Sequence, residues 1–136
     1  MLTLPTSNGM KLTSLHYFIF FVVIAIGGII AARIWGETQP GKYDEFAQCI
    51  NDSGAKFYGA FWCPHCEDQK DMFGNSQRLL PYVECSTPDR QNRTQVCIEA
   101  DIQSYPTWDL KDGTRINGVQ TMQKLAEVTE CTLTES

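Results

Sequence analysis

Acidic residues are missing from the start of this sequence, and basic residues are scarce throughout. No acid precedes Glu37, and only Lys11 and Arg33 carry a formal charge before that point. The whole chain holds 11 Lys and Arg against 16 Asp and Glu. This balance argues against a nucleic-acid binder, because phosphate contacts need a basic face. A length of 136 residues leaves no room for a two-domain enzyme, and no internal repeat or low-complexity tract is present.

One long apolar run fills the uncharged start. Tyr17–Ala32 consists of apolar residues and glycine only. Its length predicts one membrane-spanning helix over residues 15–33, after a short tail of residues 1–14. Residues 34–42 contain Gly, Pro and polar side chains, and we expect them to form a linker to a domain over residues 43–136.

A cleaved signal peptide is the alternative interpretation of this run, with Ala25-Ile26-Gly27 as a small-residue cleavage site. The run continues past that site and ends at Arg33 and Trp35, which suit a membrane interface and favour the anchor. Lys11 on one side and Arg33 and Lys42 on the other are too balanced to orient the helix. Six cysteines in so short a chain indicate an oxidising compartment. We therefore expect a single-pass membrane protein whose domain lies on the periplasmic or lumenal side.

The domain alternates helical and strand patterns. Asp44 is expected to N-cap the first helix, with Phe46, Ala47 and Ile50 on its apolar face. This order predicts an α/β fold, a central sheet with helices on both faces, in a domain small enough to profit from disulfides. The expected elements are a helix from Asp44 to Ser53, a strand at Lys56–Phe61, a helix at Glu67–Phe73, a strand at Tyr82–Cys85, a helix at Thr94–Ala100, strands at Tyr105–Trp108 and Arg115–Asn117, and a helix at Thr121–Thr129.

A Cys-x-x-Cys motif, Cys63 to Cys66, stands where the first strand ends and a helix begins. At that place the unpaired N–H groups and dipole of the helix stabilise a thiolate on Cys63. Pro64 suits the first helical turn, where its missing N–H costs nothing. His65 is partly cationic near neutral pH and should stabilise the thiolate further. A stabilised thiolate favours the reduced form and makes the disulfide a stronger oxidant.

Two plainer interpretations of the motif are weaker. A structural Cys63–Cys66 bridge closes too small a loop to constrain the unfolded chain much. A zinc site needs a second ligand pair, but Cys85 and Cys97 are 12 residues apart with no histidine near them. We therefore predict redox chemistry at Cys63 and Cys66, with no metal and no bound cofactor.

These motifs carry a family resemblance. Phe61–Cys66, with Ser104–Trp108 about 40 residues later, resembles thioredoxin-fold domains, in which Pro106 matches the cis-proline that faces the active disulfide. The Cys-Pro-His-Cys sequence is similar to that of DsbA-type disulfide oxidases. Gly54–Cys66 and Tyr82–Cys85 narrow the resemblance to the thioredoxin-like partner domain fused to bacterial vitamin K epoxide reductase homologues. It covers about residues 43–131.

The resemblance implies a membrane-tethered thiol oxidoreductase that oxidises exported protein thiols. Electrons would pass to a vitamin K epoxide reductase-like membrane protein, which would reduce a quinone. Cys63 would be the exposed, reacting sulfur and Cys66 the buried, resolving one. Pro106 would leave the backbone of Tyr105 beside Cys63 to pair with an extended substrate, and Trp62 and Tyr105 would form a substrate-contacting rim. Both aromatic side chains are equally consistent with plain packing.

The sequence departs from this resemblance at one position that bears on proton transfer, and the resemblance also implies a pairing of the other cysteines. Thioredoxin and DsbA bury an acid six residues before the first active cysteine, and Phe57 occupies that position here. Cys85 and Cys97 would form a local bridge that pins the intervening loop. Cys49 and Cys131 would tie the ends of the domain together, since the first and last helices of such a fold pack on the same face. An electron-relaying role for Cys85 and Cys97 is the alternative.

Three functions remain open at this point. The leading one is a monomeric disulfide oxidase. The second is an extracytoplasmic reductase with the opposite electron flow, against which His65 argues, because thioredoxin-like reductants tend to lack that thiolate stabiliser. The third is a non-catalytic, membrane-bound binding module.

Overall fold

A computed structural model describes residues 9–134 of the chain. The chain divides into two compact units, Met1–Gln39 and Pro40–Ser136. The described residues of the first unit form the helix α1, at Gly9–Thr38. Within it, Ser14–Gly36 has a mean hydropathy of 2.4 and is long and apolar enough to cross a membrane, a property that signal sequences share. The helix extends beyond the predicted span of residues 15–33 into the predicted linker, and it ends just before Pro40, whose ring disfavours helical backbone in the preceding residue.

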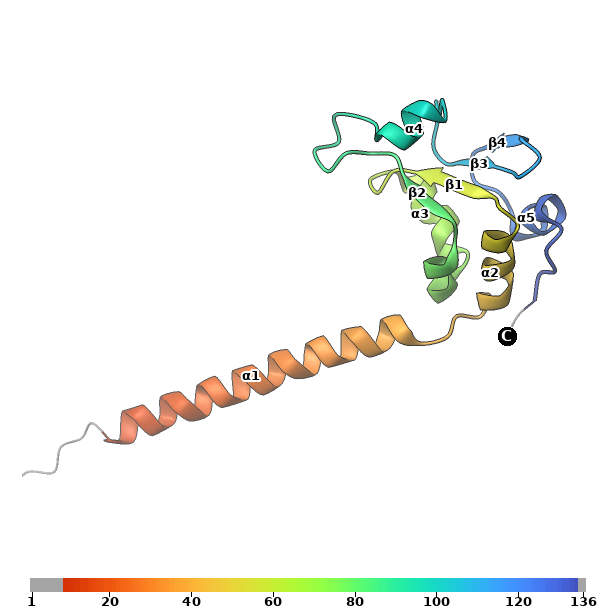
Figure 1. The fold of residues 1–136 in the computed structure, drawn as a ribbon. Coiled ribbons are helices and arrows are strands. Elements are labelled where there is room, and N and C mark those ends of the chain that lie inside the picture. Colours follow the sequence, from red (N-terminus) through yellow and green to blue (C-terminus); the bar gives the residue numbers. More distant parts are fainter. Residues whose placement is uncertain (1–8, 135–136) are drawn as a thin grey trace, which may run out of the picture. The chain divides into compact units, whose positions relative to one another are not determined.

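The second unit is a four-stranded mixed sheet with helices on both faces (Figure 1). The strand order is β2-β1-β3-β4, with β1 and β2 parallel and the other neighbours antiparallel. This confirms the predicted α/β architecture. The elements are α2 at Asp44–Asp52, β1 at Lys56–Gly59, α3 at Pro64–Asp71, the 3-10 helix η1 at Gly74–Leu79, β2 at Tyr82–Glu84, α4 at Gln95–Glu99, β3 at Thr107–Asp109, β4 at Arg115–Asn117 and α5 at Met122–Thr129.

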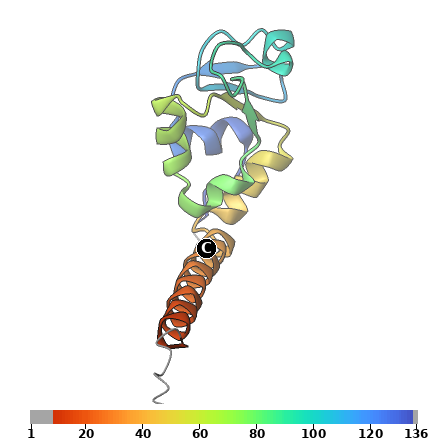
Figure 2. The same ribbon diagram turned by 90° about the vertical axis from the view of Figure 1, so that its left-hand side faces the viewer.

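The two faces of the sheet bury very different amounts of apolar surface. Helices α2, α3 and α5 lie on one side and α4 lies on the other (Figures 1 and 2). Alternation along β1 sends Phe57 into the larger core, where its ring stacks on that of Trp108 with centroids 4.6 Å apart. Tyr58 points to the smaller core beneath α4, together with Cys85, Cys97 and Ile102. We call these two sides the large-core face and the small-core face.

The start of α2 differs from the prediction. Phe46, Ala47 and Ile50 are buried, as predicted, but the N-cap is Tyr43, and Asp44 is the first helical residue. The carboxylate of Asp44 is bound by both terminal nitrogens of Arg78, at 2.5 and 2.7 Å. This partner lies 34 residues away, beyond the reach of local pattern analysis.

Helix η1 was not predicted. The chain leaves α3 through Gly74, whose φ of +53° favours glycine, and then turns through Gly74–Leu79. Ser76 of η1 is buried, and its hydroxyl accepts a hydrogen bond from the backbone N–H of Tyr43 at 2.9 Å. The turn therefore holds the segment that leads into α2.

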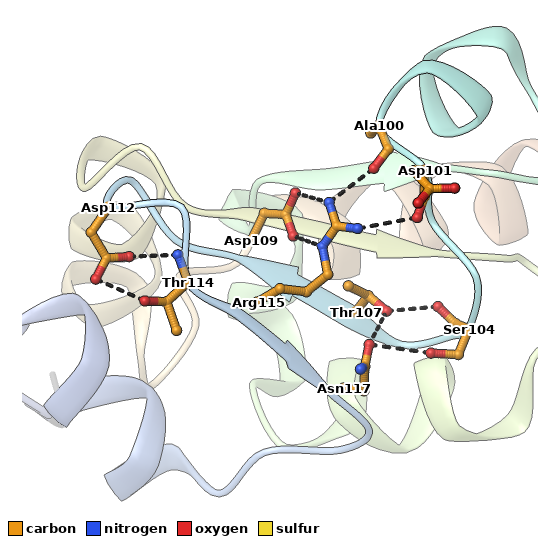
Figure 3. A network of polar contacts seen from close by, with 9 residues as sticks. All are labelled: Ala100, Asp101, Ser104, Thr107, Asp109, Asp112, Thr114, Arg115 and Asn117. Carbon is orange, nitrogen blue, oxygen red and sulfur yellow. Dashed lines mark hydrogen bonds and ion pairs between the residues drawn. The ribbon is translucent and has the colours of Figure 1, made fainter.

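On the small-core face, the side chain of Arg115 links the sheet to the segment after α4 (Figure 3). The Arg115 side chain on β4 pairs with Asp109 on β3 at 2.5 and 2.7 Å. It also donates to the carbonyls of Ala100 and Asp101, at 2.9 and 3.1 Å. These carbonyls lie just after α4, so one side chain joins the sheet to the end of that helix. Nearby, the hydroxyl of Thr107 donates to the carbonyl of Ser104 at 2.7 Å.

Candidate active site at the start of α3

The backbone places Cys63 at the junction that the sequence predicted. Strand β1 ends at Gly59, and Cys63 is the N-cap of α3 with extended dihedrals, followed by Pro64 in the first helical turn. The N–H groups of Cys66 and Glu67 donate to the carbonyl of Cys63 at 3.0 and 3.2 Å. Cys63 therefore lies at the positive end of the helix dipole.

Both cysteines of the motif are free thiols, and both are buried. Cys66 is fully buried, as expected, but Cys63 is only 7% exposed, where we predicted an exposed sulfur. The reason is the loop before β3, since the Cys63 sulfur lies 3.9 Å from the carbonyl oxygen of Tyr105. The Tyr105–Pro106 peptide bond is cis and Pro106 is buried. This contact places the cis peptide bond directly beside the Cys63 sulfur.

Burial sets the acidity of the inner thiol. Desolvation raises the pKa of Cys66 to about 12, since the surroundings disfavour the thiolate. Gly59 makes this close packing possible. A Cβ at that position would lie 2.9 Å from the Cys66 sulfur and 2.8 Å from the ring of Tyr82. Any side chain there would force the side chain of Cys66 or Tyr82 to shift.

The position of the missing acid is filled by an apolar stack. Phe57 is fully buried against Trp108 and in edge contact with the Tyr82 ring. Around that ring, the Lys70 ammonium lies 4.1 Å from the centroid, and the Tyr82 hydroxyl donates to Glu84 at 2.8 Å. Desolvation raises the pKa of Cys66, and the positive charge of Lys70 lowers it and so opposes part of that effect.

The His65 side chain is 72% exposed, and its Nδ1 lies 3.3 Å from a carboxylate oxygen of Asp68. The imidazole ring of His65 therefore lies along the surface of α3, toward Asp68. The stabilisation of the Cys63 thiolate by His65 remains a prediction based on charge and proximity in the chain.

The two rim aromatics lie against each other. The rings of Trp62 and Tyr105 meet edge to face with centroids 6.3 Å apart. The indole N–H of Trp62 donates to the hydroxyl of Ser86 at 2.8 Å, while 43% of this residue stays exposed. Trp62 is therefore held in place and still open to a partner.

Sequence analysis missed Gln69, which lies on α3 in a stretch of polar residues. It is fully buried, and its amide binds the backbone N–H and carbonyl of Gln120 at 2.7 and 3.1 Å. Its oxygen also accepts from the indole N–H of Trp108 at 3.3 Å. A glutamine among charged neighbours gives no sequence signal for such a role, although the three-residue spacing from Cys66 places both on one face of the helix.

The remaining four cysteines form two disulfides. Cys49 is bonded to Cys131 across 82 residues, and Cys85 to Cys97 across 12. These are the same pairs as in the hypothesis from sequence. The first bond joins α2 to the segment after α5, and the second joins the end of β2 to α4.

A mixed sheet in this order, a Cys-x-x-Cys helix start and a facing cis-proline together define a thioredoxin-like domain. No protein-family model matches the chain. Over 94 residues the chain is 39% identical to the thiol-disulfide oxidoreductase LTO1 of Arabidopsis thaliana. The similar region covers 66% of this chain and 25% of that protein, so the chain spans about a quarter of the length of this relative.

Proposed function

We propose that the protein is a membrane-anchored thiol-disulfide oxidoreductase that oxidises exported protein thiols. The observation that carries the proposal is the free pair Cys63 and Cys66 at a helix start, with cis Pro106 facing it, in a chain whose other cysteines are bonded. The similarity to a protein named as a thiol-disulfide oxidoreductase supports the activity. The apolar helix within α1 supports the anchor.

The reaction needs only the two sulfurs. In the oxidised protein, a substrate thiolate attacks the Cys63 sulfur, a substrate–Cys63 bond forms, and the Cys63–Cys66 bond breaks. Cys66 leaves with the electron pair and takes up a proton, which its raised pKa favours. A second substrate thiolate then attacks the sulfur bound to Cys63 and releases the Cys63 thiolate. The substrate gains a disulfide, and the protein gains two electrons.

Those electrons must leave for the next cycle. We propose that a vitamin K epoxide reductase-like membrane protein accepts them from Cys63 and Cys66 and passes them to a quinone. The resemblance of Gly54–Cys66 to the partner domains of such enzymes supports this step. The anchor would keep the domain near its partner, with the domain on the extracytoplasmic side.

The redox state of the pair in living cells tests the direction of electron flow. Cells are quenched with acid, free thiols are mass-tagged, and the bonded cysteines are replaced pair by pair as controls. A mostly oxidised pair that becomes reduced when the quinone-linked partner is removed supports the oxidase. A pair that is mostly reduced in both strains would contradict the oxidase proposal and support the reductase.

Replacement of Cys63 by Ser separates an enzyme from a binding module. Either enzyme would lose its activity with this variant, whereas a binding module would keep its function. The Cys66→Ala variant keeps Cys63 reactive and removes the resolving thiol, so mixed disulfides should accumulate on Cys63. Their absence in cells would contradict the proposed activity.

The pKa of Cys66 provides a test on purified protein. In the full, reduced chain, iodoacetamide at about pH 7 should modify Cys63 and not Cys66, because burial raises the pKa of Cys66 to about 12 and disfavours its thiolate at neutral pH. Peptide mapping after digestion identifies the modified sulfur. Equal labelling of both thiols at neutral pH would remove the distinction between a reacting and a resolving cysteine.

A further inference from the structure

A cavity of about 500 Å³ opens beside the candidate active site. Trp62 and Tyr105 both line it. Trp62 precedes Cys63 in the chain, and the carbonyl oxygen of Tyr105 lies 3.9 Å from the Cys63 sulfur. Ile98 of α4 also lines the cavity, and this residue is half exposed. The loop between β2 and α4, which the Cys85–Cys97 bond closes, supplies most of the remaining lining.

The charge of this cavity is opposite to that of the chain. Arg90 and Arg93 both line it, and no residue of its described lining carries a carboxylate. The protein as a whole has a formal net charge of −5. A cationic cavity on an anionic protein favours an acidic occupant over a basic one.

The two arginines are also unpaired, unlike the other two of the domain. Arg78 and Arg115 are each held by an aspartate at 2.5 Å, whereas within residues 9–134 neither Arg90 nor Arg93 forms an ion pair. The Arg90 guanidinium lies 5.2 Å from the centroid of the Phe61 ring, and Arg93 donates to the carbonyl of Ile102. Both are therefore held by contacts with a ring or a carbonyl, neither of which carries a formal negative charge.

We propose that this cavity binds the polypeptide segment next to the reactive cysteine of a substrate protein, and that Arg90 and Arg93 select segments with carboxylates. The inference rests on the proposed function and narrows its substrate class to thiols with acidic neighbours. An extended segment reaching Cys63 passes the backbone of Tyr105 and then enters the cavity. Alternate residues of such a segment share one face, so carboxylates about two and four positions from the cysteine would face the arginines.

Binding of redox-inert peptides tests the cavity without turnover. The probes are fluorescent peptides in which Ser replaces the reactive Cys. Each peptide carries two identical residues, Glu, Gln or Lys, at the positions two and four residues from that Ser. One set carries them on the N-terminal side of the Ser and a second set on the C-terminal side. They are titrated by anisotropy against the full chain in nonionic detergent. An exposed ion pair contributes up to about a fivefold change in Kd. On one side of the Ser, we therefore expect the Glu peptide to bind roughly tenfold more tightly than the Gln peptide. This difference should decrease at high salt.

Variants locate the effect. Arg90→Gln should lower the Glu preference by roughly two- to fivefold, and Arg90→Glu should abolish or reverse it. Lys124→Gln removes the same charge on α5, on the opposite face of the sheet, and should leave the preference unchanged. The proposal is overturned if Glu, Gln and Lys peptides bind alike, if none binds, or if Lys124→Gln matches Arg90→Gln. Oxidation of the corresponding Cys peptides is a separate readout, and its failure would instead contradict the proposed function.

Discussion

The two faces of the sheet are stabilised in different ways. The large-core face buries Phe46, Phe57, Phe73 and Trp108 among many apolar neighbours. Among the described residues, the apolar cluster of the small-core face has four buried members, two of which are bonded to each other as Cys85–Cys97. On that face Arg115 and Arg93 also bind carbonyl groups of the chain around α4. On this face the disulfide supplies two of the four buried members of the cluster, so covalent and polar links add to a small area of apolar burial. The candidate binding cavity lies on that side.

The largest expected effect is on the large-core face. Replacement of Trp108 by Ala removes a fully buried ring that stacks on Phe57, and it leaves the Gln69 oxygen without its indole donor. A buried Trp→Ala change costs about 3–5 kcal/mol, which is a large part of the stability of a small domain. Urea unfolding followed by far-UV circular dichroism measures the loss. A cost below about 1 kcal/mol would show that this core is not the main support of the fold.

The two disulfides should differ in the extent of the structure that they hold. By the chain-entropy relation, replacing Cys49 and Cys131 by Ser costs about 4.5 kcal/mol, and replacing Cys85 and Cys97 costs about 3 kcal/mol. The first pair belongs to the large-core face, and its loss should lower global stability. The second supports the small-core face, and its loss should increase hydrogen exchange at α4 and the loop before it. Uniform exchange changes in both double variants would contradict the contrast between the faces.

An intermediate effect is expected for Arg115. The change to Met keeps part of the apolar stem but removes the donors to Ala100 and Asp101 and the partner of Asp109. Because the pair is partly exposed, we expect a loss of about 1–2 kcal/mol. Hydrogen exchange should rise around α4 and not in α2. Arg78→Met is the control, because it breaks the matching pair on the large-core face.

The smallest effect is the pH dependence of the Asp44–Arg78 pair. Hydrogen bonds from Arg78 hold the pKa of Asp44 well below its ordinary value of 3.8. The pair therefore stabilises the fold above about pH 4, and its contribution falls as the pH drops toward the lower pKa of the folded state. Asp44→Asn should lower the Tm slightly at neutral pH, and the difference should shrink in acid and in high salt. A constant difference from pH 7 to about pH 2 would point to packing instead of charge.

Most of the element order could be predicted from the sequence, because strands and helices of this domain have clear local patterns. The junction at Cys63 is an example in which a few neighbouring residues are sufficient. Features that depend on distant partners could not be predicted. The role of Asp44 depends on Arg78, and the burial of Cys63 depends on the loop at Tyr105.

Polar residues in the core were the other limit. Gln69 and Ser76 are both fully buried, yet each lies in a stretch whose composition indicates exposure. Their partners are backbone groups of Gln120 and Tyr43, which pattern analysis cannot assign. The cavity with Arg90 and Arg93 could not be predicted either. The sequence shows two arginines in a polar loop, and only the fold places them beside Trp62.

The Cys49–Cys131 bond also determines how the domain would bear mechanical load. A pulling force between α1 and the C-terminus of the chain would pass along residues 40–49, across the two sulfurs and out through residue 131. The 82-residue loop between them, which holds the whole sheet and the Cys63 site, would carry no tension. Only reduction of that bond would expose the loop to force and release up to roughly 290 Å of extended chain.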